Sequence, residues 1–390
     1  MGKNEKVYDN NNLIDYVNWR GDLSFEESPI NKIDLAIFSE LAMLDFNGIL
    51  VNDDISIKEA RKLYFDCESC KKDKLGLILP DSILLLFKKM ALSRRYQNLL
   101  LSDYLEIVSE EEETQVSSLV IKISDEMRVV SFSGTDDSII GWKEDFMMLY
   151  RSPIPSQEKS FNYLNKILDK YSDSKFYVCG HSKGGNMAIY SALNLDDLKY
   201  KKIIHIYNFD GPGFPKDFIN DEKYISKLFK VSTILPQSST IGKLFEHRET
   251  IEIVKSSKKG LYQHDIFSWE LSRNDFVYEK ALTDVSIKVD CKIKEVMDML
   301  SIEEKEMFVE SSYKVLSFTK AKDLRTLSER KRKIIEGFFK LNKIEKKAVF
   351  KPLKSLFSDK LVRKVFLDSF KEFLKINKIK VDLDIDEEIL

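Results

Sequence analysis

The chain has 390 residues, enough for one large or two modest domains, and its 43% hydrophobic and 11% aromatic content indicates a packed globule. Its 62 basic and 64 acidic residues nearly cancel, so the net charge of −2 gives no reason to expect nucleic acid as a partner. No apolar run reaches the roughly 18 residues of a transmembrane segment, and residues 1–12 lack the hydrophobic core of a secretory signal. We expect a cytoplasmic protein, while export without such a signal stays open.

The four cysteines are too few for a disulfide framework in a chain of this size. Cys67 and Cys70 form an isolated C-x-x-C motif without a second pair or a nearby histidine. We therefore expect reduced thiols at these positions rather than a zinc or redox site. No metal and no other cofactor is expected.

Residues 1–100 are expected to be mainly helical, because 33–44 and 82–99 carry apolar residues at i, i+3 and i+4. A meander of three short strands follows between about Tyr104 and Phe132. Beyond it, helices are expected over 141–148, 157–171, 184–195 and 222–229, and strands over 175–179, 202–209, 230–235 and 249–254. This alternation predicts a mostly parallel sheet that helices cover on both faces.

After about residue 285 the sequence predicts Lys- and Glu-rich amphipathic helices, over 292–300, 302–318, 324–343 and 360–376. A basic amphipathic helix can lie on a membrane surface. Interspersed acidic residues favour an ordinary solvated face instead, so peripheral membrane contact stays open.

The most informative motif is Gly180-His-Ser-Lys-Gly184, a G-x-S-x-G between an apolar strand and a helix. In a nucleophile elbow, a serine at such a sharp turn adopts a strained backbone, and its flanking glycines avoid collisions with the strand and the helix. Ser182 is therefore a candidate nucleophile. The alternative is a tight packing turn that merely contains a serine.

A serine nucleophile needs a base, and the chain has only four histidines. His181 lies inside the elbow and is expected to point elsewhere, and His205 lies in the middle of a predicted strand. His264 lies in a loop after the last core strand, where α/β-hydrolases place their base. We select His264, with His247 as the alternative.

The acid that orients the base should follow a later strand. Asp210 ends the strand I-I-H-I-Y-N-F and precedes Gly211-Pro-Gly213, a turn that would expose its carboxylate at the carboxyl end of the sheet. The alternative is a residue that only caps the turn. Glu246 and Asp265 are the reserve candidates.

An oxyanion hole needs two backbone N–H groups directed at the developing charge. The N–H of Lys183, directly after the nucleophile, is one candidate. Thr135 follows the predicted strand M-R-V-V-S-F and a glycine, and it could donate both its N–H and its hydroxyl. An ordinary turn at the strand end is the alternative.

The run F-S-G-T, then W-x-x-D-F, then G-H-S-K-G-G-N-M-A resembles class 3 (fungal-type) lipases, in which F-R-G-[ST] builds the oxyanion hole before G-H-S-L-G-G. The chain resembles more fully the related Mbeg-like bacterial α/β-hydrolases, a domain of unknown function. Residues 11–25, the F-D-G-P-G-F run at 209–214 and the Q-H-D…W of 263–269 carry this similarity, which spans roughly residues 10 to 275.

The resemblance, taken together with the pattern of elements along the chain, implies an α/β-hydrolase core over 101–284, with a helical N-terminal segment over 1–100 packed on it and a helical C-terminal module over 285–390. It also implies ester hydrolysis on an undefined substrate. One departure stands out, because the lipases carry a catalytic Asp where this chain reads S-S-T-I-G at 238–242. That favours Asp210 as a relocated acid and also leaves a weakened triad open.

The leading hypothesis is a serine hydrolase of carboxylic esters, acting on a small-molecule or lipid-like substrate through Ser182, His264 and Asp210. The second is a catalytically weak hydrolase fold that binds a partner through its C-terminal helices. An acyltransferase or peptidase on the same triad is a third, which the sequence does not separate from an esterase.

Overall fold

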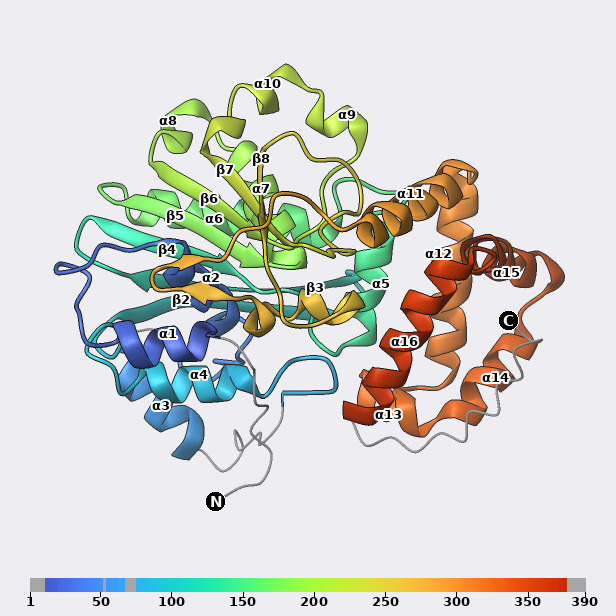
Figure 1. Ribbon diagram of the computed structural model, residues 1–390, viewed down its shortest axis with the longest axis horizontal. Helices are drawn as coiled ribbons and strands as arrows, with labels where there is room; N and C mark the ends of the chain where they lie inside the picture. The colour runs from blue at the N-terminus through green and yellow to red at the C-terminus, as the bar shows by residue number, and fades with distance from the viewer. Residues whose placement is uncertain (1–10, 52–53, 67–74, 377–390) are drawn as a thin grey trace.

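The central element of the computed structural model is an eight-stranded sheet in the order β1-β2-β3-β4-β5-β6-β7-β8 (Figure 1). The structure describes residues 11–51, 54–66 and 75–376. Neighbouring strands from β4 to β8 are parallel, and those from β1 to β4 are antiparallel. The strands are β1 (Ile55–Ser56), β2 (Leu100–Ser109), β3 (Thr114–Lys122), β4 (Met127–Phe132), β5 (Lys175–His181), β6 (Ile203–Phe209), β7 (Val231–Pro236) and β8 (Thr250–Val254). The predicted α/β-hydrolase-type sheet is confirmed.

Helices cover both faces of the sheet, because alternate strand residues point to opposite sides. In β3, Leu119 and Ile121 join one hydrophobic cluster, whereas Val116 and Val120 join the other. The first cluster is closed by α1 (Leu13–Arg20), α2 (Lys32–Leu41), α3 (Ile57–Asp66) and α4 (Ser82–Met90), and the second by α6 (Pro155–Lys170) and α7 (Lys183–Leu193). The N-terminal helices thus form one layer of the same core, and the domain boundaries stay a prediction.

Several short elements join the main ones at the rims of the sheet. They are α5 (Ile139–Met147), α8 (Asp197–Tyr200), α9 (Lys216–Ile219), α10 (Glu222–Ile225), the 3-10 turns η2 (Leu228–Lys230), η3 (Gly260–His264) and η4 (Ile266–Ser268), and a hairpin of β9 (Leu271–Ser272) and β10 (Asp275–Phe276). The helix expected over 222–229 is therefore wrong beyond Ile225. The helix expected over 82–99 ends at Met90, because the chain then turns to bury Arg95 against Asp34, with Nη2 and Oδ2 2.6 Å apart.

The C-terminal helices lie at the end of the molecule farthest from α1 and α3 (Figure 1). They are α11 (Asp284–Asp298), α12 (Ile302–Phe318), α13 (Leu324–Glu329), α14 (Lys331–Lys340), α15 (Lys343–Phe357) and α16 (Lys360–Ile376). The helix expected over 324–343 is broken at Arg330, whose guanidinium donates to the Thr319 carbonyl (2.7 Å). The sequence analysis missed α15, which starts at an Asn342 capping box and tolerates Pro352 inside it.

Polar contacts hold these helices on the sheet layer. Lys143 of α5 pairs with Glu310 of α12, with Nζ and the carboxylate 2.9 Å apart. The Ser286 hydroxyl of α11 donates to the Ser239 carbonyl (2.5 Å). The C-terminal helices therefore contact the loop that follows β7.

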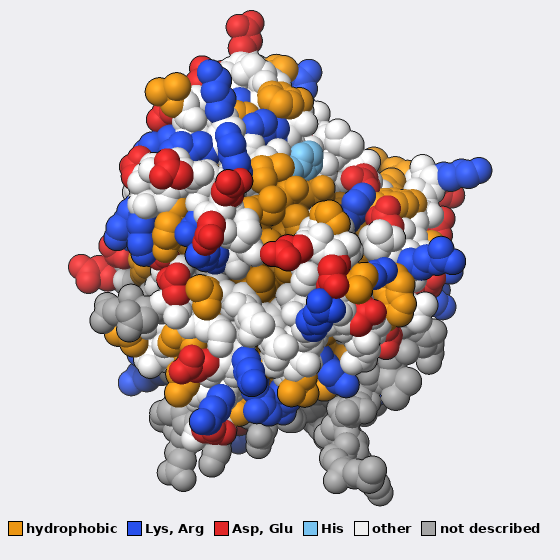
Figure 2. Space-filling view, turned by 90° about the vertical axis from the view of Figure 1, so that its left-hand side faces the viewer, with side chains coloured by type: hydrophobic (Ala, Val, Ile, Leu, Met, Phe, Trp, Pro, Cys, Tyr) orange, Lys and Arg blue, Asp and Glu red, His pale blue; other side chains and the backbone are white. Residues whose placement is uncertain are grey.

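The opposite side of the molecule is hollowed, and hydrophobic side chains gather there within a ring of Lys, Arg, Asp and Glu (Figure 2).

Among the described residues, no helix is long and apolar enough to cross a membrane. Cys179 and Cys291 are free thiols. The C-x-x-C motif of Cys67 and Cys70, where we expect reduced thiols, lies outside the described residues.

Candidate active site

Ser182 stands at a sharp turn between β5 and α7, as the motif predicts. Its φ of 58° and ψ of −131° lie in a region that non-glycine residues rarely adopt. A Cβ on Gly180 would lie 2.2 Å from Gly184, and a Cβ on Gly184 would lie 2.2 Å from the Phe132 carbonyl oxygen. Both elbow glycines are therefore required by close backbone packing, and this confirms the predicted geometry of the turn.

The parallel strands bring the candidate residues to one edge of the sheet. The Ser182 N–H donates to the Phe209 carbonyl (2.9 Å), and the Asp210 N–H donates to the Ile234 carbonyl (2.9 Å). Asp210 is fully buried, and its Oδ2 lies 2.7 Å from Nδ1 of His264 at the end of η3. Asp210 and His264, chosen from the sequence as acid and base, are thus a hydrogen-bonded pair.

Ser239, in the S-S-T-I-G segment at 238–242, contacts the carboxylate of Asp210. The Ser239 hydroxyl donates to Oδ1 of Asp210 at 2.5 Å, so both carboxylate oxygens have partners. A Cβ on Gly242 would lie 2.4 Å from that same Oδ1. The S-S-T-I-G segment therefore packs closely around the carboxylate of Asp210 and supplies it with a hydrogen bond.

Two polar residues hold the loop that carries His264. Nε2 of His181 lies 2.9 Å from the His264 carbonyl oxygen, and Nδ1 of His181 lies 2.9 Å from Oε1 of Glu40. Burial by itself lowers the pKa of His181, but the carboxylate of Glu40 outweighs it and the pKa is raised. Buried Gln263 accepts from the Ser238 N–H (2.7 Å) and donates to the Lys258 carbonyl (2.9 Å). His181 is thus held between Glu40 and the loop that carries His264, and it supports that loop.

The loop after β4 lies directly against the elbow. A Cβ on Gly134 would lie 3.2 Å from Cβ of Ser182, which puts Thr135 next to the nucleophile turn. The Thr135 hydroxyl donates to Oδ2 of Asp145 (2.6 Å). Because a hydroxyl has one proton, the expectation that this hydroxyl also serves an oxyanion is corrected, and the backbone N–H is the donor left for that role.

Lys183 is buried beside the nucleophile with two carboxylates. Its Nζ lies 3.1 Å from Glu144, which is fully buried, and 3.4 Å from Asp145. Burial alone lowers the pKa of Lys183, yet Glu144 and then Asp145 outweigh it and raise the pKa. Glu144 also accepts from the N–H groups of Gln115 (2.9 Å) and Ser156 (2.6 Å). These charges link α7 to the loop that carries Thr135.

The remaining candidates have other partners. His247 has an acceptor at each ring nitrogen, Glu249 Oε1 and the Gly242 carbonyl, both at 2.6 Å. His205 contacts Ser232, and the reserve acid Asp265 caps η4 by accepting from the Phe267 N–H (3.1 Å). The other reserve acid, Glu246, forms an ion pair with Lys294 at 3.5 Å.

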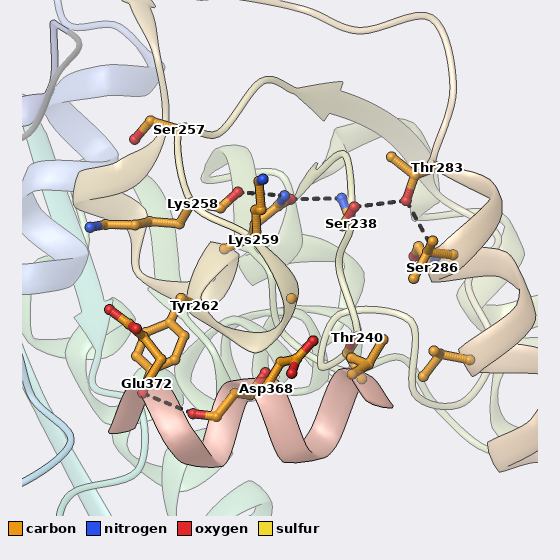
Figure 3. A pocket seen from close by; sticks show the side chains of 16 residues that line it. Ser238, Thr240, Ser257, Lys258, Lys259, Tyr262, Thr283, Ser286, Asp368 and Glu372 are labelled. Carbon is orange, nitrogen blue, oxygen red and sulfur yellow. Dashed lines mark hydrogen bonds between the residues drawn. The ribbon is translucent and has the colours of Figure 1, made fainter. Parts of the chain in front are cut away.

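A pocket of about 590 Å³ opens between the base loop and the helices α11 and α16 (Figure 3). Ser238 and Thr240 from the acid loop line it on one side, and Asp368 and Glu372 of α16 line it on another. Tyr262 of η3 donates from its hydroxyl to the Ser369 carbonyl (3.2 Å). The pocket therefore adjoins the supports of Asp210 and His264, and the C-terminal helices form part of its wall.

Within the described parts of the chain, no cluster of three or more His, Cys, Asp or Glu could hold a metal ion.

The sequence analysis did not find Glu40, Glu144 or Ser239 as part of this site. A signal existed for Glu40, because Asp34 and Glu40 place two carboxylates in the mostly apolar helix I-D-L-A-I-F-S-E-L. A carboxylate inside an apolar helix face needs a buried partner. That partner, His181, comes from a segment 141 positions later, so the pairing itself was not predictable from local pattern.

The model of the Mbeg1-like family matches residues 90–314, more than half of the chain. The chain belongs to the Mbeg1-like family. The matched range includes Thr135, Ser182, Asp210 and His264 of this Mbeg1-like chain. No curated protein gives a significant match.

The Mbeg1-like chain is also similar to solved fungal lipases. The Rhizomucor miehei lipase propeptide complex has 16% identity and a TM-score of 0.31, over 41% of this chain and 57% of that chain. Lipase II from Rhizopus niveus has 12% identity and a TM-score of 0.35, over 70% and 93%. The lipase from Rhizopus microsporus var. chinensis has 13% identity and a TM-score of 0.31, over 59% and 77%.

Proposed function

We propose that this Mbeg1-like protein is a serine hydrolase of carboxylic esters, with Ser182 as nucleophile, His264 as base and Asp210 as acid. The observation that carries the proposal is the 2.7 Å contact between His264 Nδ1 and buried Asp210, at the sheet edge where strained Ser182 stands. A carboxylate on Nδ1 holds the imidazole in the tautomer whose Nε2 accepts a proton.

In the proposed reaction, Nε2 of His264 takes the proton of the Ser182 hydroxyl while Oγ attacks the ester carbonyl carbon. The negative charge on the carbonyl oxygen is stabilised by the N–H groups of Lys183 and Thr135, and by the N-terminus of α7. His264 then gives its proton to the leaving alcohol. A water molecule, activated by the same histidine, hydrolyses the acyl-enzyme.

The pocket beside the base loop is proposed to receive one end of the substrate. Its wall carries the hydroxyls of Ser238 and Thr240 and charged groups of both signs, Lys259 and Asp368 among them. Val285, Val289 and Val365 also line it, and most of its exposed lining is apolar, so the pocket suits an acyl chain with polar groups beside it. A lipid-like ester with a polar head and a small-molecule ester both meet this requirement.

The test is hydrolysis of a series of p-nitrophenyl esters by the purified full-length chain. Ser182→Ala is expected to reduce kcat by about 10⁶-fold with an unchanged melting temperature. Thr240→Phe, which narrows the pocket, is expected to raise KM for esters with long or bulky acyl groups and to leave short esters unaffected. Unchanged hydrolysis in Ser182→Ala would contradict the proposal, and a folded wild type that hydrolyses none of the esters would favour a binding protein on the same fold.

A further inference from the structure

The helices α14 and α15 carry an exposed face on which aromatic and aliphatic side chains lie among basic ones. Phe339 is 71% exposed, Ile344 66%, Ile335 58% and Phe350 57%. The segment 330–354 contains ten Lys or Arg residues and two Glu residues. This segment is therefore strongly basic in a chain whose total charge is nearly balanced.

In α14 the apolar residues on the outer side are not turned toward the protein core. The inner side is fixed by Gly337, where a Cβ would lie 2.9 Å from the Val315 carbonyl oxygen of α12. Ile335 and Phe339 are four residues apart and lie on the opposite, solvent side of the helix. Packing within the chain therefore does not explain why these two residues are apolar.

The outer side of α15 continues this surface. Its exposed residues Lys343, Lys347, Phe350, Lys351 and Lys354 recur at helical spacing. The rings of Phe338 and Phe350 lie 5.1 Å apart and join the two helices. Lys346 donates to the Phe339 carbonyl at 3.1 Å. We refer to the exposed residues of 331–354 as the basic-aromatic face.

Carboxylates of α12 balance only part of the charge of this face. Glu345 is paired with Lys314 of α12 at 2.7 Å. Lys351 has a partner in Glu304, at 2.6 Å. Lys331, Arg332 and Lys333 are exposed at the start of α14, next to Ile335. A partner that fits must be anionic over a wide area and must also accept apolar side chains.

We propose that the basic-aromatic face docks the protein on an anionic lipid bilayer. Phosphate headgroups meet the Lys and Arg side chains, while Phe339 and Ile335 enter the boundary between headgroups and acyl chains. A nucleic acid would satisfy the charge and leave the aliphatic residues unexplained. The proposal is independent of the ester chemistry, because binding is measured without turnover.

The experiment is sedimentation of the full-length chain with unilamellar vesicles of phosphatidylcholine, with or without phosphatidylglycerol. Binding to the vesicles that contain phosphatidylglycerol, weakened by salt, is expected. Lys331→Gln, Arg332→Gln and Lys333→Gln together should weaken it about a hundredfold at low salt, from about fivefold per charge. Phe339→Ser should weaken it about tenfold.

Matched controls use exposed residues on the sheet layer. Phe229→Ser removes a ring that is 74% exposed, and Lys175→Gln, Lys216→Gln and Lys223→Gln together remove three exposed charges. These variants are expected to bind like wild type. Absence of binding by folded wild type, or equal losses in the controls, would overturn the proposal. Self-association that Phe339→Ser abolishes, without vesicle binding, would also overturn it and would assign the face to a second copy of the chain.

Discussion

At the edge of the sheet that carries Ser182, charged side chains are buried and paired, whereas on α14 and α15 they are exposed beside exposed aromatic rings. Lys183 is 2% exposed between Glu144 and Asp145, while Phe339 is 71% exposed. Buried charges are stable only with fixed partners, so the first arrangement holds atoms in one geometry. The second leaves charge and apolar area available for contact. The comparison separates the region for which we propose chemistry from the region for which we propose attachment.

The largest effect that this comparison predicts is on the rate, at Asp210. Asp210→Asn keeps the shape of the side chain and removes the charge that orients His264. We expect kcat to fall by about 10⁴-fold, because the imidazole then favours the wrong tautomer. Asp265→Asn, at the neighbouring reserve acid that caps η4, is the matched control and should retain activity within a few-fold. Steady-state kinetics on a short ester measures both. Equal losses of kcat in the two variants would contradict the specific role of Asp210 in orienting His264.

The second effect concerns stability at Lys183. Lys183→Met leaves Glu144 buried without its cation, and we expect the free energy of unfolding to fall by about 3–5 kcal/mol. Adding Glu144→Gln to that variant should restore part of the loss, because of the two carboxylates beside Lys183 only Asp145 then remains without its cation. Urea denaturation of the two variants and wild type gives the values. A single variant as stable as wild type would show that the pair does not hold the elbow.

The third effect is a pH dependence at Glu249, whose carboxylate contacts His247 and Thr233. Burial raises the pKa of Glu249, but hydrogen bonds and charge from His247 outweigh this effect and lower it from 4.5 to about 2. A lowered pKa stabilises the fold above pH 4.5, and this stabilisation is lost as pH falls from 4.5 toward 2. Wild type should exceed Glu249→Gln by about 3 kcal/mol near neutral pH.

This difference between wild type and Glu249→Gln should shrink steadily as the pH is lowered below 4.5. Urea unfolding at several pH values checks it. A difference that stays constant with pH would mean that Glu249 stabilises the loop by packing alone.

The smallest effect is expected on the exposed face. Phe339→Ser should change the free energy of unfolding by less than about 0.5 kcal/mol, as is usual for surface substitutions. It should also leave hydrolysis of a short soluble ester unchanged. Thermal melting and the ester assay measure these outcomes. A large loss of stability or of ester hydrolysis would show that Phe339 supports the folded core, and this would contradict the contrast between the two regions.

The sequence predicted the parallel strands, the elbow and the Asp210–His264 pair, because each depends on local pattern and on the order of elements. It did not predict Glu40 on His181, Ser239 on Asp210 or Glu144 on Lys183, since no motif and no position in the order of elements marks these residues as partners. It also missed α15, because a proline usually ends a helix and Pro352 lies inside this one. The capping box of α15 is at Asn342. The division of the chain at residues 100 and 284 and the cytoplasmic location stay predictions.

The measurement that tests the central claim most directly is labelling of the full-length chain with a fluorophosphonate probe, followed by mass spectrometry of its peptides. The account predicts one modified residue, Ser182, and loss of labelling in Ser182→Ala and His264→Ala while both variants keep the wild-type melting temperature. Labelling that persists in Ser182→Ala, or well-folded wild type that does not react, would contradict the account.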